Sequence, residues 1–220
     1  PTRGPNAGPR VGPLVISEIL YAPPAGEAEF VEVYCLSPTN VPLYDPGAPT
    51  NRWEFRGVGT FVFPSGAVAV AMDTFVVTGT NPAAFRARFN LASNYPVYGP
   101  FTGRLDNVGD VLRLARPLEF DRTNMPYEVD EEIEYNDKAP WPAVAGQGRS
   151  IRRVSLAAFG NDPANWTAGP VNGRPGPRPM EDSDGDGLPD RWEGPRGLDL
   201  ASPSAAVDSD GDALTDLAEY

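Results

Sequence analysis

Aspartate stands at residues 182, 184, 186 and 190, and a glutamate closes the segment at residue 193. The segment fits the calcium-loop pattern D-x-[DN]-x-[DN]-G-x5-E at each fixed position. Calcium is a hard cation that takes about six to eight oxygen ligands, and alternate side chains of such a loop supply them together with one backbone carbonyl. The sequence therefore predicts a Ca²⁺ site whose ligands are Asp182, Asp184, Asp186, Leu188 through its carbonyl, Asp190 and Glu193.

A second copy of the pattern begins 26 residues after the first. It departs at Ala213, where the first copy has Gly187. A positive φ at that position costs an alanine roughly 1 kcal/mol, so we expect the second site to be weaker or distorted but present. Its predicted ligands are Asp208, Asp210, Asp212, Leu214 through its carbonyl, Asp216 and Glu219.

Charge separates this acidic part from the rest of the chain. Residues 181–220 carry twelve acids against two arginines, which accounts for most of the net charge of −12. Such a segment repels phosphate backbones and attracts cations, which argues against nucleic acid as a partner. An acidic disordered tail is the alternative reading, but it does not explain Gly187 or the spacing to Glu193.

Composition excludes several kinds of catalytic site. The chain has no histidine, so triads and zinc sites that need imidazole are excluded. The single cysteine, Cys35, stands in an apolar stretch, which favours a small buried side chain over a nucleophile. Residues 128–134 hold several acids, and we interpret them as the solvated face of an edge strand rather than a catalytic carboxylate pair. Arg152 and Arg153 either balance that run or meet an acidic partner.

The elements that position the acidic loops divide into three parts. Residues 1–13 form three Pro-to-Gly tetrads and a final proline, which predicts an N-terminal arm that is disordered or orders against a neighbouring subunit. Residues 14–177 contain short stretches rich in β-branched and aromatic residues with turn residues between them, which favours an antiparallel β-sandwich. Residues 178–220 form the small calcium-loop module. The expected strands are residues 14–21, 29–36, 60–63, 67–72 and 111–115.

Local patterns add detail to the sandwich. In residues 132–135, Ile133 and Tyr135 alternate with glutamates, which predicts one buried and one solvated face. A short helix is expected at residues 82–89, with Phe85 and Phe89 on one side. Trp141 and Trp166 are expected to anchor the core. Near the acidic loops, Pro175 and the two prolines after it exclude an entering helix before the first loop, and Gly194-Pro195 makes the exiting helix short.

The motif order in residues 178–220 resembles the thrombospondin type 3-like, or dockerin-like, calcium repeats of bacterial surface proteins. The resemblance rests on the first loop, then Gly-Leu-Asp, then Ser-Pro-Ser, then a second loop that ends in Ala-Glu-Tyr. It implies that the loops act outside the cell as rigid, calcium-dependent spacers or docking elements.

Residues 14–177 resemble the lamin-tail domain. The resemblance implies an immunoglobulin-like antiparallel β-sandwich, of a kind that is extracellular, attached to other domains and not itself catalytic. Departures at Cys35 and in a longer insertion that holds residues 52–56 leave the local loop geometry open. The matching pieces, in the family's order, are residues 15–21, 29–34, 63–66, 99–103, 105–110, 112–114, 133–137, 140–142, 148–151 and 161–166.

The sequence thus predicts a non-catalytic, calcium-binding structural protein at the cell surface or outside the cell. We expect it to associate with itself or with other surface proteins, in a filament, tube, coat or adhesin. We expect no membrane span, because no apolar run is long enough. The alternative is an accessory binding module cut from a larger secreted hydrolase.

Overall fold

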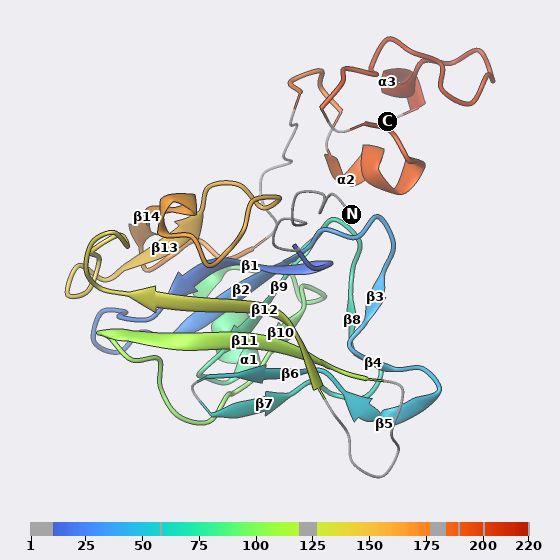
Figure 1. Cartoon of the computed structure of the whole chain (residues 1–220). Helices are drawn as coiled ribbons and strands as arrows, with labels where there is room; N and C mark the ends of the chain where they lie inside the picture. Colours follow the sequence, from blue (N-terminus) through green and yellow to red (C-terminus); the bar gives the residue numbers. More distant parts are fainter. Residues whose placement is uncertain are drawn as a thin grey trace, which may run out of the picture.

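A computed structural model describes residues 11–57, 59–118, 127–176, 184–188, 190–199 and 201–219. Most of the predicted N-terminal arm and the predicted ligand Asp182 lie outside these residues. We call the described residues 11–176 the sandwich and the described residues 184–219 the acidic module (Figure 1).

Two β-sheets make up the sandwich, and the predicted all-β, sandwich-like fold is confirmed. Their strands are antiparallel except for one parallel pair, β9 with β10. The six-stranded sheet has the order β10 (Val97–Tyr98), β9 (Thr74–Thr78), β2 (Phe30–Cys35), β1 (Leu14–Leu20), β13 (Arg149–Arg153) and β14 (Trp166–Val171). The four-stranded sheet has the order β12 (Tyr127–Asn136), β11 (Gly109–Pro117), β6 (Glu54–Arg56) and β7 (Thr60–Val62).

Shorter elements complete the described chain. Two small two-stranded sheets pair β3 (Val41–Pro42) with β8 (Val68–Ala69), and β4 (Tyr44–Asp45) with β5 (Ala48–Arg52). The helices are α1 (Pro82–Phe89), η1 (Pro163–Asn165), α2 (Asp190–Glu193), η2 (Gly194–Arg196) and α3 (Asp216–Glu219). No helix in the described part of the chain is both long and apolar enough to cross a membrane.

The main core lies between the two large sheets, and strand alternation selects its members. Val31 and Val33 point from β2 into this core, where they join Phe55 and Leu112 of the four-stranded sheet. Phe30 faces the other side, as the alternation predicts, and packs in a second apolar cluster with α1. The predicted core residues Trp141 and Trp166 are both buried, with ring centroids 5.9 Å apart.

Helix α1 covers part of the outer face of the six-stranded sheet, and its bounds match the prediction. It begins because Asn81 caps it, accepting hydrogen bonds from the amides of Ala83 and Ala84 at 2.9 and 3.1 Å. Asn90 ends it in a left-handed conformation. Phe85, buried under the helix, meets the Phe30 ring at a centroid distance of 5.4 Å.

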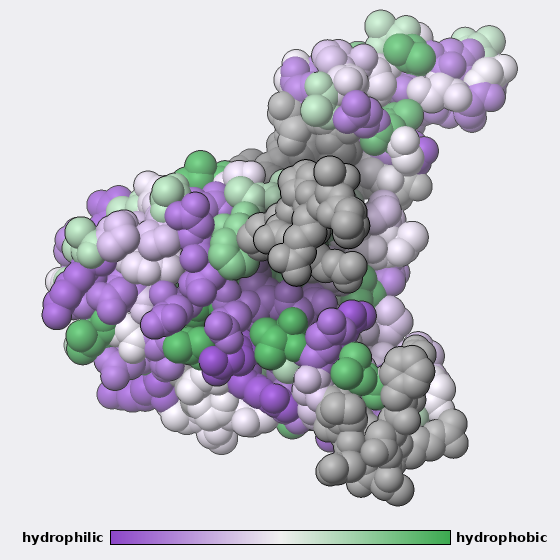
Figure 2. Space-filling model, viewed as in Figure 1, coloured by the Kyte–Doolittle hydropathy of each residue, from purple (hydrophilic) through white to green (hydrophobic). Residues whose placement is uncertain are grey.

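Strand β12 is the edge of the four-stranded sheet, as predicted for the acidic run. Its outward glutamates pair across to β11, with 2.6 Å between Glu132 and Arg113 and between Glu128 and Arg116. Polar side chains accordingly dominate the face over β11 and β12 in Figure 2. One acid departs from the predicted solvated face: Glu131 is buried, because it shares the inward side of β12 with Ile133 and Tyr135.

The segment at residues 52–56, which we expected to lie in an insertion, builds part of the sandwich. Most of it forms β6, which pairs with β11, and both Trp53 and Phe55 are buried in the main core. Cys35 is buried at the end of β2, and burial raises the pKa of its thiol. This agrees with its interpretation as a small core side chain.

Candidate metal centre

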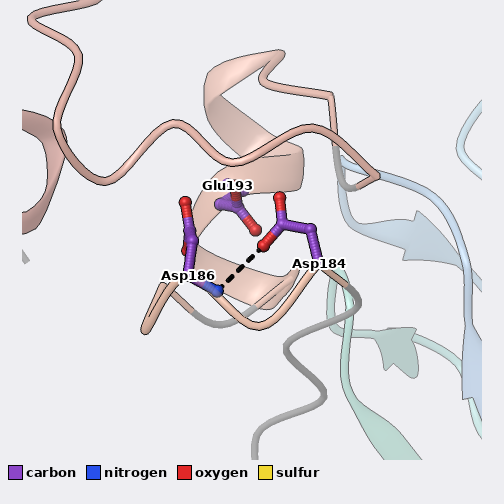
Figure 3. A group of neighbouring side chains, drawn as sticks. All are labelled: Asp184, Asp186 and Glu193. Carbon is purple, nitrogen blue, oxygen red and sulfur yellow. Dashed lines mark hydrogen bonds between the residues drawn. The ribbon is translucent and has the colours of Figure 1, made fainter.

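Three carboxylates of the first loop come together. Oxygen atoms of Asp184, Asp186 and Glu193 all lie within 4.8 Å of one another. The two aspartates are half-buried, and Glu193 is fully buried at the end of α2. Figure 3 shows the aspartates approaching from the loop and Glu193 from the helix.

Local hydrogen bonds give the loop this shape. The amide of Asp186 donates to Asp184 Oδ1 at 3.1 Å, and the amide of Leu188 donates to Asp186 Oδ1 at 2.8 Å. Gly187 between them has φ +96°, a conformation that glycine adopts without steric cost. The Leu188 side chain is fully buried, so the loop is also anchored by an apolar contact.

Asp186 connects the first loop to the chain that comes after it. Its Oδ2 accepts amide hydrogen bonds from Ser204 at 2.6 Å and Ala205 at 2.7 Å. Desolvation opposes ionisation, but the amides of Leu188, Ala205 and Ser204 outweigh it and lower the pKa of Asp186. The Ser204 hydroxyl also lies 3.3 Å from Glu193 Oε1. Two of the gathered carboxylates are thus oriented by the same short segment.

The second loop repeats the local hydrogen-bond pattern. The amide of Asp212 donates to Asp210 Oδ1 at 3.1 Å, and that of Leu214 donates to Asp212 Oδ1 at 2.9 Å. Asp208, Asp210 and Asp212 also hold oxygens within 4.8 Å of one another, but all three are exposed. Ala213 has φ +76°, so the premise that an alanine occupies a left-handed position is confirmed.

The remaining acids of the second loop lie outside that group of three. Asp216 is buried and accepts hydrogen bonds from the amide of Ser209 at 3.1 Å and its hydroxyl at 2.7 Å. The Ser209 hydroxyl is the main cause of a lowered pKa for Asp216. Glu219 is exposed, and desolvation followed by Asp210 and Asp212 raises its pKa. Glu219 is therefore close enough to sense the aspartates of the loop.

The two loops pack against one segment, residues 204–207. On the side of the second loop, Asp216 donates its amide to the Val207 carbonyl at 2.7 Å, and Leu217 donates to the Ala205 carbonyl at 3.1 Å. Sequence reasoning assigned no role to this segment or to Ser209, because the motif fixes only the acidic and glycine positions. The available signals were Ser204, in the Ser-Pro-Ser between the loops, and a serine at the second position of both loops.

The structure brings together three of the six predicted ligands in each loop. Asp190 begins α2, but its side chain is not among those described, and Asp182 lies outside the described residues. Ligation by the carbonyls of Leu188 and Leu214 stays a prediction. The gathered donors are all carboxylate oxygens, which fit a hard divalent cation such as Ca²⁺. Each group could hold a metal ion, and the first is the more enclosed.

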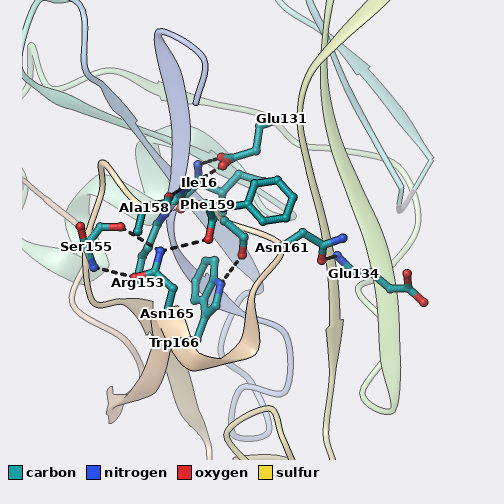
Figure 4. Close-up of polar contacts among 11 residues, drawn as sticks. Ile16, Glu131, Glu134, Arg153, Ser155, Ala158, Phe159, Asn161, Asn165 and Trp166 are labelled. Atoms are coloured by element: carbon teal, nitrogen blue, oxygen red, sulfur yellow. Dashed lines mark hydrogen bonds and ion pairs between the residues drawn. The ribbon is translucent and has the colours of Figure 1, made fainter. Parts of the chain in front are cut away.

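Glu131 is a different kind of acidic site. It borders a pocket of about 230 Å³ between β12 and residues 159–161. Arg153 donates to one of its oxygens at 2.6 Å, and the amide of Ile16 donates to the other (Figure 4). The same guanidinium also donates to the carbonyls of Ile16 at 3.2 Å and Ala158 at 2.5 Å. Both oxygens are therefore committed to joining β12 to the six-stranded sheet, which is a structural role.

Comparison of the chain with models of protein families, with curated proteins and with solved structures found no match.

Proposed function

We propose that this chain is a non-catalytic, extracellular structural protein whose acidic module binds calcium. The observation that carries the proposal is the gathering of Asp184, Asp186 and Glu193 within 4.8 Å in a loop of the predicted spacing. Carboxylates at that separation repel one another, and a divalent cation relieves the repulsion. The resemblance to lamin-tail domains and to calcium repeats of surface proteins supports a place outside the cell.

The proposed role is in assembly, as a subunit of a filament, tube, coat or adhesin that joins other copies or other surface proteins. Calcium would remove much of the self-repulsion of the acidic module and fix its two loops against residues 204–207. Extracellular calcium modules bind in the range of about 10⁻⁴ to 10⁻³ M. Calcium outside the cell is then sufficient to order the module.

A pair of matched variants tests the proposal. Glu193→Gln keeps the size of the side chain but weakens a ligand of the first loop, whereas Glu219→Gln makes the same change at an exposed position of the second loop. We expect Glu193→Gln to weaken calcium binding at the tighter site and to reduce calcium-dependent association, measured by calorimetry and by light scattering. A chain that binds no calcium would contradict the proposed calcium binding. A Glu193→Gln variant that loses the site yet associates normally would contradict its coupling to assembly.

A further inference from the structure

Two glutamates lie opposite each other on the outer face of the six-stranded sheet. Glu18 of β1 and Glu32 of β2 are cross-strand partners, and both are fully buried. Like charges directly opposite destabilise a sheet, and a buried carboxylate costs free energy unless donors replace water. Hydrogen-bond donors that replace water must therefore offset the cost of burying these two side chains.

Part of the compensation comes from the sheet itself. The Ser150 hydroxyl donates to Glu18 Oε1 at 2.5 Å, and the Ser17 hydroxyl donates to Glu32 Oε1 at 2.6 Å. Arg152 Nε lies 3.6 Å from Glu18 Oε2. This distance allows an ion pair but is too long for a hydrogen bond. These neighbours orient the two carboxylates toward the chain that crosses above them.

That chain is residues 173–176, which we call the strap. The amide of Arg174 donates to Glu18 Oε1 at 2.9 Å, and the amide of Gly176 donates to Glu32 Oε2 at 3.1 Å. Thr74 of β9 donates its hydroxyl to the Gly176 carbonyl at 3.1 Å, so this residue is held through both of its backbone groups. Alternate amides of the strap thus bind the carboxylates of two adjacent strands.

The strap fits closely on the sheet. Gly173 has φ +70°, and a Cβ there would lie 2.5 Å from the Phe30 ring, so a larger residue displaces the strap or the ring. Pro175 and Gly176 are buried. Burial and the charge-assisted hydrogen bonds from its amides to the two carboxylates together distinguish the strap from a loosely attached linker.

A second contact joins the acidic module to the sandwich near the start of β9, where the strap ends. A Cβ on Gly194 would lie 3.2 Å from Met72 Cγ, so η2 packs directly on the turn before β9. Met72 is two residues from Thr74, the residue that holds the end of the strap. The chain therefore leaves the sandwich and returns to it at neighbouring points, and α2 lies at that side of the sandwich in Figure 1.

We infer that the strap is a fixed joint: it holds the acidic module at the start of β9, with Glu18 and Glu32 as positioning residues. Protein groups donate to both oxygens of Glu32 and to one oxygen of Glu18, and Arg152 lies beside the other, so the joint does not depend on metal. It fixes Gly176, the last described residue before the acidic module, whether or not the loops bind calcium.

Hydrogen exchange followed by NMR on the full chain in chelator tests the joint. We expect the amides of Arg174 and Gly176 to exchange at least about a hundredfold more slowly than in an unstructured peptide. The double change Glu18→Gln and Glu32→Gln should cost roughly tenfold or more of that protection, because an amide is a weaker acceptor. Glu132→Gln with Glu134→Gln, on the outward face of β12, is the control and should change nothing at the strap.

A further variant covers the case in which the double change unfolds the sheet. Gly173→Ala leaves both carboxylates intact and should release the strap while the amides of β1 and β2 stay protected. Strap amides that exchange like an unstructured peptide in the unchanged chain, or that keep full protection in both variants, would overturn the inference. The measurement uses no metal, so it stands apart from the question of whether the loops bind calcium.

Discussion

In the sandwich, Glu131 accepts hydrogen bonds from Arg153 and from the amide of Ile16, whereas in the acidic module Asp184, Asp186 and Glu193 gather around one another. Seven ion pairs between described side chains lie in the sandwich. The buried acids of the sandwich therefore accept hydrogen bonds from a guanidinium, from amides and from serine hydroxyls. The acidic module brings acids together in a way that an external cation would stabilise.

The largest expected effect comes from removing a protein cation from a buried acid. Arg153→Leu leaves Glu131 buried without its guanidinium and should destabilise the sandwich by about 3–5 kcal/mol at pH 8. Arg113→Leu removes a partner from Glu132 in a pair that is about 40% exposed, and should cost less than about 1 kcal/mol. Urea unfolding compares the two, and equal losses would show that burial of the pair does not matter.

A dependence of stability on pH should arise from the same buried acid. Burial raises the pKa of Glu131 from 4.5 to about 7, although Arg153 and the Ile16 amide oppose the shift. The folded chain then binds this proton more tightly than the unfolded chain, so the stabilisation is fully present below about pH 4.5 and is lost as pH rises through 7. The loss should reach at most about 3 kcal/mol.

Glu131→Gln isolates this contribution from the other titrating acids. The difference in free energy of unfolding between the unchanged chain and the variant should change between pH 4.5 and 7 and be flat above about pH 8. A difference that is flat across the whole range, or that favours the unchanged chain more strongly as pH rises, would show that the pKa of Glu131 is not raised.

A smaller effect should come from the left-handed position of each loop. Ala213→Gly relieves a residue at φ +76° and should strengthen metal binding to the second loop by about fivefold, which corresponds to roughly 1 kcal/mol. Gly187→Ala places the same strain at φ +96° in the first loop and should weaken that site by a similar factor. Calorimetry on both variants measures the pair. Shifts of the same sign would contradict the assigned role of this position.

The sequence predicted those parts of the fold that depend on local patterns. Phenylalanines four apart, at residues 85 and 89, predicted α1 with its observed bounds. Alternation predicted the buried and solvated sides of β12 around Ile133. The repeated spacing of aspartates predicted that carboxylates come together in each acidic loop, and three do so in each.

What sequence reasoning missed depends on contacts between distant segments. Glu131 shares the inward side of β12, but its partner Arg153 lies 22 residues away, and nothing local shows that the two meet. Residues 54–56 have few turn signals and were assigned to an insertion, although pairing with β11 makes them a strand. The strap amides that donate to Glu18 and Glu32 come from residues more than 100 positions further along the chain.

The most direct test of the account is a calorimetric calcium titration of the full chain and of two matched variants, Asp184→Ala and Asp210→Ala. Each removes the aspartate at the third position of its loop, and both aspartates belong to the gathered groups. The account predicts two sites of unequal affinity, with the tighter one lost in Asp184→Ala and retained in Asp210→Ala, while circular dichroism shows the sandwich folded in all three. Loss of the tighter site in Asp210→Ala, or no calcium binding by the unchanged chain, would contradict it.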